Sequence, residues 1–327
     1  MEFRTELNIP ISDFKIGYND PILMLGSCFS QHIGERLQYY KFKCNVNPFG
    51  TIFNPVSIAK LITYVSNCTS VLPDELILSH GIYVHPDFHS VLSDENEEMA
   101  LIKINSAIAE TNTFMKQARF VFLTPGTSVA YKSNKTGAVV ANCHKLPASN
   151  FTKINIGIQE GVNVLIQLIN DIHKINPDIK IIFTVSPVRH TKEGLIQNAR
   201  SKARLINMVE LIQSEYNEIA YFPSFEWMMD DLRDYRYYDA DLIHPNETAI
   251  NYIWEKFCTH YFSDETNVLL KEIKKIKLAV GHKPFSKNSN DFKEFCTTNL
   301  NEIHSLKSRY PNLDFDHEIS WLNAYIS

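Results

Sequence analysis

A cysteine on a predicted strand-to-helix turn is the first residue whose position suggests chemistry. The apolar run 22–25 predicts a buried strand, and Gly26-Ser27-Cys28-Phe29-Ser30 follows it, before a helix expected from about residue 31. Glycine permits a sharp turn, and the free N–H groups that begin a helix stabilise an anion. Such a site lowers the pKa of a thiol and can hold an oxyanion. Cys28 is therefore the candidate nucleophile and Ser27 the alternative, although a buried apolar thiol and a helix-capping serine fit the same residues.

A pair of residues late in the chain supplies the proton chemistry that such a nucleophile needs. Asp241 and His244 form an Asp-x-x-His pattern, and Pro245 keeps His244 out of the helical region, at the entrance to the next predicted helix. In acyl transfer an imidazole takes and returns the proton while a carboxylate orients the ring. We expect His244 to be the base and Asp241 its orienting group. The alternative is a helix N-terminal cap without catalytic function.

Small and polar residues after the other predicted strands could bind an oxyanion or a substrate. The carboxyl ends of parallel strands meet at one edge of a sheet, so residues that follow the strands should lie together. The candidates of this kind are Gly50, Gly126, Thr127, Ser128, Asn142 and His144. Gly50 could offer an unobstructed backbone N–H. A glycine at such a position is equally typical of an ordinary turn.

Charged and imidazole side chains are also expected to face this crevice. Arg189 and His190 follow the fourth predicted strand, where a contact to a substrate anion or a surface ion pair is expected. His85, Asp87 and His89 alternate, so an extended strand would place them on one face, as a metal site requires. No further ligand pattern supports a metal. We therefore expect His85 and His89 to line the substrate pocket, with no metal bound.

Short apolar runs alternate with stretches of helical period, which is typical of a parallel sheet with helices on both faces. The predicted strands are 22–25, 42–46, 120–123, 179–185 and 219–222, and the predicted helices include 101–115, 158–172, 195–212, 247–260 and 269–278. We expect a three-layer α/β/α, flavodoxin-like domain with about five parallel strands over residues 1–262. The insertion of about 54–115 is expected to form a lid, and residues 263–327 a C-terminal helical extension.

Composition excludes several classes of protein. The chain of 327 residues has 32 Lys and Arg against 37 Asp and Glu, a net charge of −5, and no basic stripe, which argues against a nucleic-acid partner. No apolar run approaches the ~18 residues of a membrane span, which argues against a membrane partner. The six cysteines contain no C-x-x-C pair, and the opening residues lack a signal-peptide pattern. We expect a protein of a reducing compartment, the cytoplasm.

Four motifs together resemble those of the GSCFA family. They are Gly26-Ser27-Cys28-Phe29, Asn47-Pro48-Phe49-Gly50-Thr51, Ser186-Pro187-Val188-Arg189-His190 and Asp241-x-x-His244-Pro245, and the resemblance covers roughly residues 5–260. The family is related to the SGNH/GDSL hydrolases. This relationship implies that Cys28 occupies the position of the nucleophilic serine and that Gly50 is the second oxyanion residue. The third oxyanion residue of that superfamily, an asparagine, is absent at Gly126-Thr127-Ser128, where Ser128 or Asn142 could replace it.

We therefore expect an acyl-ester hydrolase or acyltransferase of SGNH type that acts on a small-molecule or carbohydrate ester. The resemblance to capsule-biosynthesis proteins with a G-N-C-Q turn implies transfer, and the carbohydrate class rests on the resemblance alone. No metal or bound cofactor is needed, and transfer would use an acyl donor such as coenzyme A. The alternative is a non-catalytic carbohydrate- or ligand-binding protein on the same fold, because a thiol replaces the hydroxyl and the asparagine is missing. Oligomeric state is left open.

Overall fold

A parallel sheet of five strands forms the centre of the computed structural model, which describes residues 5–282 and 289–326. Its strands are β1 (Ile22–Gly26), β2 (Cys44–Val46), β5 (Phe120–Thr124), β9 (Lys180–Phe183) and β10 (Ala220–Tyr221). Their spatial order is β10-β9-β5-β1-β2, and every pairing is parallel. This is the strand order of flavodoxin, in which the direction of strand addition along the sheet reverses between β1 and β5. The predicted fold class and its five strands are confirmed.

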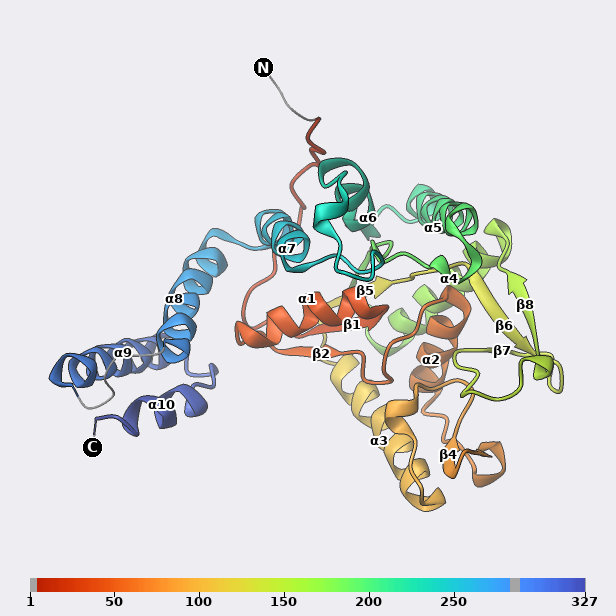
Figure 1. Cartoon of the computed structure of the whole chain (residues 1–327), viewed down its shortest axis with the longest axis horizontal. Helices are drawn as coiled ribbons and strands as arrows, with labels where there is room; N and C mark the ends of the chain where they lie inside the picture. Colours follow the sequence, from red (N-terminus) through yellow and green to blue (C-terminus); the bar gives the residue numbers. More distant parts are fainter. Residues whose placement is uncertain (1–4, 283–288, 327) are drawn as a thin grey trace.

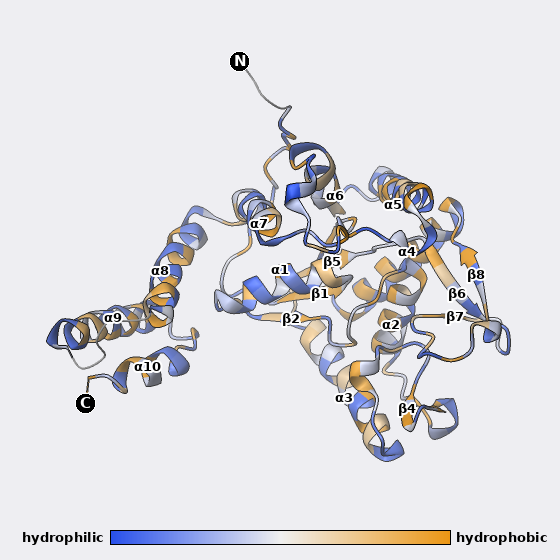
Figure 2. Cartoon of the chain, viewed as in Figure 1, coloured by the Kyte–Doolittle hydropathy of each residue, from blue (hydrophilic) through white to orange (hydrophobic). Residues whose placement is uncertain are grey.

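Alternate residues of the inner strands β1 and β5 enter two separate hydrophobic cores. Along β1, Ile22 and Met24 belong to one core, whereas Leu23 and Leu25 belong to the other. A strand that is buried on both faces has no polar positions, which is why these runs are continuously apolar in the sequence. Figure 2 shows the hydrophobic residues gathered on the central strands and on the inward sides of the helices.

Helices cover both faces of the sheet (Figure 1). On the face of Ile22 and Met24 lie α1 (Cys28–Tyr39) and α7 (Glu247–Tyr261). On the opposite face lie α2 (Pro55–Asn67), α3 (Glu97–Met115), α4 (Ile158–Ile175) and α5 (Leu195–Glu215). No helix in the described ranges 5–282 and 289–326 is both long and apolar enough to cross a membrane.

The segment expected as a lid is built mainly into this helical layer. Helix α2 packs against α4, and both α2 and α3 bury apolar side chains in the core beneath β1 and β5. Only the hairpin of β3 (Ile77–Ser79) and β4 (Ile82–Val84) and its flanking turns stand apart from the layer. Most of residues 54–115 therefore does not form the expected lid, because the apolar faces of α2 and α3 pack against the sheet.

A second, antiparallel sheet was not predicted. It contains β6 (Val129–Ser133), β7 (Val139–Val140) and β8 (Phe151–Asn155) in the order β7-β6-β8. Its strands are only half-buried, so they lack the continuous apolar runs of the central sheet. Single-turn and short helices complete the described elements: η1 (Pro73–Glu75), η2 (Ser90–Leu92), η3 (Ala148–Asn150), η4 (Thr191–Glu193), α6 (Ser224–Glu226), η5 (Trp227–Asp231) and η6 (Tyr235–Tyr237).

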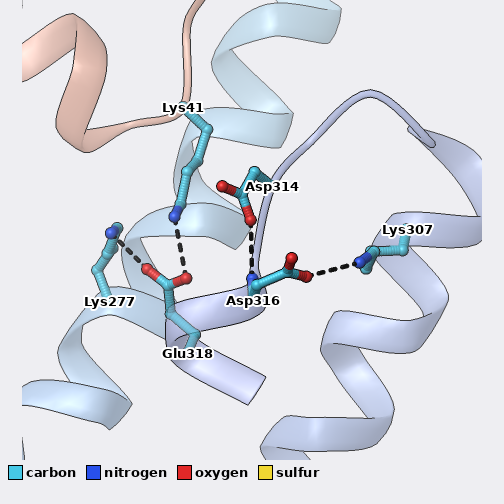
Figure 3. Close-up of polar contacts among 6 residues, drawn as sticks. All are labelled: Lys41, Lys277, Lys307, Asp314, Asp316 and Glu318. Carbon is cyan, nitrogen blue, oxygen red and sulfur yellow. Dashed lines mark hydrogen bonds and ion pairs between the residues drawn. The ribbon is translucent and has the colours of Figure 1, made fainter. Parts of the chain in front are cut away.

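The C-terminal extension consists of α8 (Asp264–Gly281), α9 (Asn290–Arg309) and α10 (Asp316–Asn323) and stands at one end of the molecule, beyond α7 (Figure 1). Its apolar residues continue the core that covers the face of Ile22 and Met24. The carboxylate of Glu318, 1% exposed, accepts hydrogen bonds from Lys277 of α8 and from Lys41, which follows α1 (Figure 3). This buried ion cluster joins α10 both to α8 and to the α/β domain.

Candidate active site

The turn between β1 and α1 requires glycine at its first position. Gly26 has a φ of +139°, and a Cβ there would lie 2.3 Å from the carbonyl oxygen of Thr124. The Gly26 N–H donates to Asn47 Oδ1 at 2.9 Å, so a side chain that follows β2 fixes the turn. Asn47 is a positioning residue that the sequence reasoning did not select, although it begins the Asn-Pro-Phe-Gly motif.

Cys28 is the first residue of α1 and is half-buried at the end of the sheet. The N–H groups of Cys28 and Phe29 and the charge of Lys202 favour the thiolate. Burial nevertheless outweighs these effects and raises the pKa of the thiol above its ordinary value. The expectation that the helix start lowers this pKa is therefore wrong, because the loss of water around the sulfur disfavours its charge more than the helix N-terminus favours it.

Ser27, the alternative nucleophile, faces the interior. It is 1% exposed, and within the described part of the chain its Oγ has no hydrogen-bond partner. Ser27 occupies the cap position of α1, but its side chain makes no capping hydrogen bond. Its Cβ lies 3.5 Å from the position that a Cβ on Gly126 would take, so Ser27 is packed against the end of β5. Cys28 is the more accessible of the two residues.

The structure brings Asp241 and His244 together at the same end of the sheet. His244 Nδ1 lies 2.6 Å from Asp241 Oδ2, and the His244 N–H donates to Asp241 Oδ1 at 3.0 Å. These hydrogen bonds lower the pKa of Asp241 to about 2. A carboxylate only accepts, so Nδ1 carries the proton of this hydrogen bond, and Nε2 is the ring nitrogen that Asp241 does not hold. Both side chains are more than one-third exposed.

Arg189 holds the loop that carries this pair. Its guanidinium lies 3.9 Å from the ring centroid of Tyr238 and 5.1 Å from that of Tyr235. Nη1 donates to the Leu242 carbonyl, and the Arg189 N–H donates to the Ile243 carbonyl. Among the contacts of the described residues Arg189 forms no surface ion pair, and its contact with a substrate anion stays a prediction. Arg189 is instead a positioning residue for His244.

Replacing Arg189 by methionine is expected to lower kcat roughly tenfold with little change in KM, because a loosened loop places His244 less often in its working position. Arg189→Lys should not restore the rate, since an ammonium lacks the planar group that stacks on Tyr238. Steady-state kinetics with p-nitrophenyl acetate measures both constants. A raised KM at unchanged kcat would return Arg189 to the substrate-binding residues.

His190 occupies the centre of the site. Its Nε2 lies 3.5 Å from the position of a Cβ on Gly126, and its ring contacts Phe53 edge-on. Burial lowers the pKa of His190 to about 4, with further contributions from the charges of Lys202 and His244. The imidazole is therefore neutral near pH 7 and can donate or accept a hydrogen bond. His190 and Thr127 also line a cavity of about 170 Å³, together with Phe53 and residues of β6.

Several backbone groups expected to bind the oxyanion are engaged elsewhere. The Gly50 N–H donates to the Asn47 carbonyl at 2.7 Å, and the N–H groups of Gly126 and Thr127 both donate to the Phe53 carbonyl. Ser128 is fully buried and bonds to Ser201 of α5 through both its N–H and its hydroxyl. The N–H groups of Gly50, Gly126, Thr127 and Ser128 are therefore all engaged within the protein.

Asn142 and His144 lie at a different cavity. They line, with His85 and Asp87, a space of about 700 Å³ between the β3–β4 hairpin and the small antiparallel sheet. His144 Nε2 bonds to the His85 carbonyl, and burial lowers the pKa of both imidazoles. The structure thus separates Asn142 and His144 from the residues around Cys28.

The alternating histidines do not converge as ligands would. Asp87 pairs with Lys60 at 2.6 Å, whereas His89 packs on Gly50, where a Cβ would lie 2.4 Å from the Cβ of His89. Across residues 5–282 and 289–326, no three His, Cys, Asp or Glu side chains are arranged to hold a metal ion. His89 lines neither of the two cavities described above.

Lys202 is the functional candidate that the sequence reasoning missed. It lies on α5 with 1% of its surface exposed, and its Nζ donates to the carbonyls of Gly126 and Ser186 at 2.6 Å each. These carbonyls follow β5 and β9, so the ammonium lies directly beneath the strand ends. The sequence does indicate that Lys202 is buried, because its spacing places it on the apolar face of α5 with Leu205, Val209 and Ile212.

The fold and this site define a class: a parallel α/β protein with a half-buried thiol, an Asp–His pair and a buried lysine at the carboxyl ends of its strands. The chain belongs to the GSCFA family, whose model matches residues 21–257, and the model of the GSCFA C-terminal domain matches residues 273–327. No curated protein matches the sequence.

Proposed function

We propose that the protein is an acyl-ester hydrolase or acyltransferase whose nucleophile is Cys28. The observation that carries this proposal is the Asp241–His244 pair, which is hydrogen-bonded at 2.6 Å at the same sheet end as a thiol on the first turn of α1. A nucleophile, a base and an orienting carboxylate are what acyl transfer needs. The resemblance of these motifs to the SGNH/GDSL hydrolases supports the same reaction class.

The reaction has two steps. In the first, His244 Nε2 takes the Cys28 proton, the sulfur attacks the acyl carbon, and the alcohol of an ester, or the thiol of a coenzyme A donor, leaves with the proton from His244 as the enzyme thioester forms. In the second, water or an acceptor alcohol attacks the thioester, its proton passes to His244, and the thiol is regenerated with that proton. We assign stabilisation of the oxyanion in both steps to the N–H groups of Cys28 and Phe29 at the start of α1.

The cavity beside His190 supplies a place for the substrate. Its walls include apolar residues of β6 and β7, and its rim carries Asn198 and Lys192. A space of about 170 Å³ fits a short acyl group or a few atoms of an alcohol. We propose a small or carbohydrate ester as the substrate, and a coenzyme A thioester as the donor where the reaction is transfer. A catalytic thiol also favours a reducing compartment, the cytoplasm.

Two observations favour a second candidate, a ligand-binding protein without turnover. The amides of Gly50, Gly126 and Thr127 all donate to backbone carbonyls of the protein, and burial raises the pKa of the Cys28 thiol. Both features lower the reactivity expected of an esterase. The two candidates are separated by whether an acyl group is ever bound covalently.

Acyl-enzyme trapping tests the proposal. Brief incubation with p-nitrophenyl acetate, acid quenching and peptide mass spectrometry are expected to place an acetyl group on Cys28. Cys28→Ala should lose that adduct, whereas Ser27→Ala should keep it, and neutral hydroxylamine should remove it as it removes thioesters. An adduct on Ser27 would move the nucleophile by one residue. The absence of any adduct with p-nitrophenyl acetate or acetyl-coenzyme A would favour the binding protein.

A further inference from the structure

We propose that Lys202 is the cation that stabilises the Cys28 thiolate from beneath the sheet end, and so determines how readily the nucleophile forms. The functional meaning of this inference rests on the proposed thiol chemistry. The interaction itself can be measured without any turnover.

Lys202 is surrounded by carbonyl groups and by the ring of Phe225, whose centroid lies 5.8 Å from Nζ. Two of its N–H groups are directed at the Gly126 and Ser186 carbonyls, each at 2.6 Å, and an ammonium has three. Among the described residues, no Asp or Glu pairs with Lys202. A buried ammonium without a counter-charge is strongly disfavoured, so a group that can become an anion beside it has a clear electrostatic reason to be there.

Cys28 is that group. Lys202 Nζ donates to the carbonyl of Gly126, and Gly126 packs against Ser27, the residue before Cys28, at 3.5 Å between the Ser27 Cβ and the position of a Cβ on Gly126. In this arrangement the charge of Lys202 favours the Cys28 thiolate, and a thiolate favours the ammonium. Burial lowers the pKa of Lys202 to about 7 and raises that of Cys28. The difference in free energy between the neutral amine–thiol pair and the ammonium–thiolate pair is therefore smaller than it would be if each ion were buried alone.

The other ionisable groups of the site have positions and roles that differ from those of Lys202. His244 and Asp241 lie on the exposed side and can exchange protons with substrate, and the negative charge of Asp241 opposes the thiolate. His190 lies between, neutral near pH 7 because of burial and the charges of Lys202 and His244. Lys202 is thus the buried positive group that favours the Cys28 thiolate, whereas His244 remains free to act as base.

The test is the pH dependence of Cys28 alkylation. Wild-type protein and Lys202→Met are labelled with iodoacetamide over a pH series, and the Cys28 and Cys68 peptides are quantified by mass spectrometry. In Lys202→Met the Cys28 profile is expected to move to higher pH by about one unit, a roughly tenfold slower reaction at a fixed pH below its midpoint. Methionine keeps the length of the stem and removes only the charge and its donors.

Two controls make the result specific. Cys68 is exposed in the same protein, so its alkylation should be unchanged between the variants. Arg200→Met removes a charge from the exposed face of α5 and should leave the Cys28 profile as in wild type. An unchanged Cys28 profile in folded Lys202→Met overturns the inference, as does an equal shift in Arg200→Met.

A reciprocal measurement covers the case in which Lys202→Met does not fold. Linkage requires that removing the thiol by Cys28→Ala lowers the pKa of Lys202, which NMR of nitrogen-labelled lysine side chains detects. A Lys202 titration that is the same with and without the thiol would reject the interaction. Both readouts are independent of acyl transfer, so absence of an acyl adduct rejects the proposed function while leaving the Lys202–Cys28 interaction to its own result.

Discussion

His244→Ala is expected to lower the turnover of an acyl ester by roughly 10²–10⁴-fold, the usual contribution of a general acid–base group. The His244 Nδ1 is held by a carboxylate, at 2.6 Å from Asp241 Oδ2, and among the described residues its Nε2 has no hydrogen-bond partner. The side chain is 38% exposed, so its removal leaves no cavity in either core. Steady-state kinetics with circular dichroism as a check of the fold measures the effect.

Controls for this variant are available in the same chain. His304→Ala removes an exposed imidazole from α9 and should retain the wild-type rate. Asp241→Asn should also lower turnover, because an amide no longer selects the tautomer with the proton on Nδ1. Since the pKa of Asp241 is about 2, its carboxylate stays charged throughout the range from pH 4 to 9, and an acid limb of the rate profile must come from another group. Turnover by His244→Ala within a few-fold of wild type would reject the triad.

Glu318→Ala is expected to lower the free energy of unfolding by about 3 kcal/mol, the lower end of the effect of breaking a buried ion pair. The carboxylate is 1% exposed and lies between Lys41 and Lys277, whose side chains are 14% and 16% exposed (Figure 3). Alanine leaves the two ammonium groups facing each other without a counter-charge. Urea denaturation should show the loss, and proteolysis should begin in residues 263–327.

The matched control is Glu302→Ala, which removes an exposed partner of Lys275 on α9. Exposed pairs contribute about 0–1 kcal/mol, so this variant should unfold nearly as wild type does. Burial alone would raise the pKa of Glu318, but the hydrogen bonds from Lys277 and Lys41 hold it below 4.5. The stabilisation is therefore complete above pH 4.5 and is lost as the pH falls below it. Equal losses in the two variants at pH 7 would contradict the assigned role of the buried cluster.

The central sheet could be predicted because its strands are buried on both faces. The runs 22–25 and 120–123 are continuously apolar, and the observed strands differ from them by one residue. The strands β6 and β8 could not be found in the same way. Val129–Ser133 and Phe151–Asn155 are half-buried and pair across a long separation in sequence, so neither period nor apolarity marks them.

The residues of the candidate site that come directly after predicted strands could be predicted from the sequence. Cys28, His190 and the Asp241–His244 pair were located from their places after predicted strands, and the structure gathers them at one edge of the sheet. Lys202 was missed because a lysine in a helix normally faces solvent. The hydrogen bond from the Gly50 N–H to the Asn47 carbonyl could not be predicted from the sequence either, since hydrogen-bond partners in a turn depend on tertiary geometry.

The small antiparallel sheet has a consequence for how the family can diversify. The cavity beside His190 is walled by Val129, Ala130 and Val140, whereas the groups proposed to react stand on α1 and on the loop that precedes α7. Under the proposed function, changes in β6 or β7 are therefore expected to alter which molecules are accepted without moving the atoms that react. Natural variants that differ in substrate should accumulate their differences in residues 129–155, and exchange of that segment between two of them should transfer preference while preserving the chemistry.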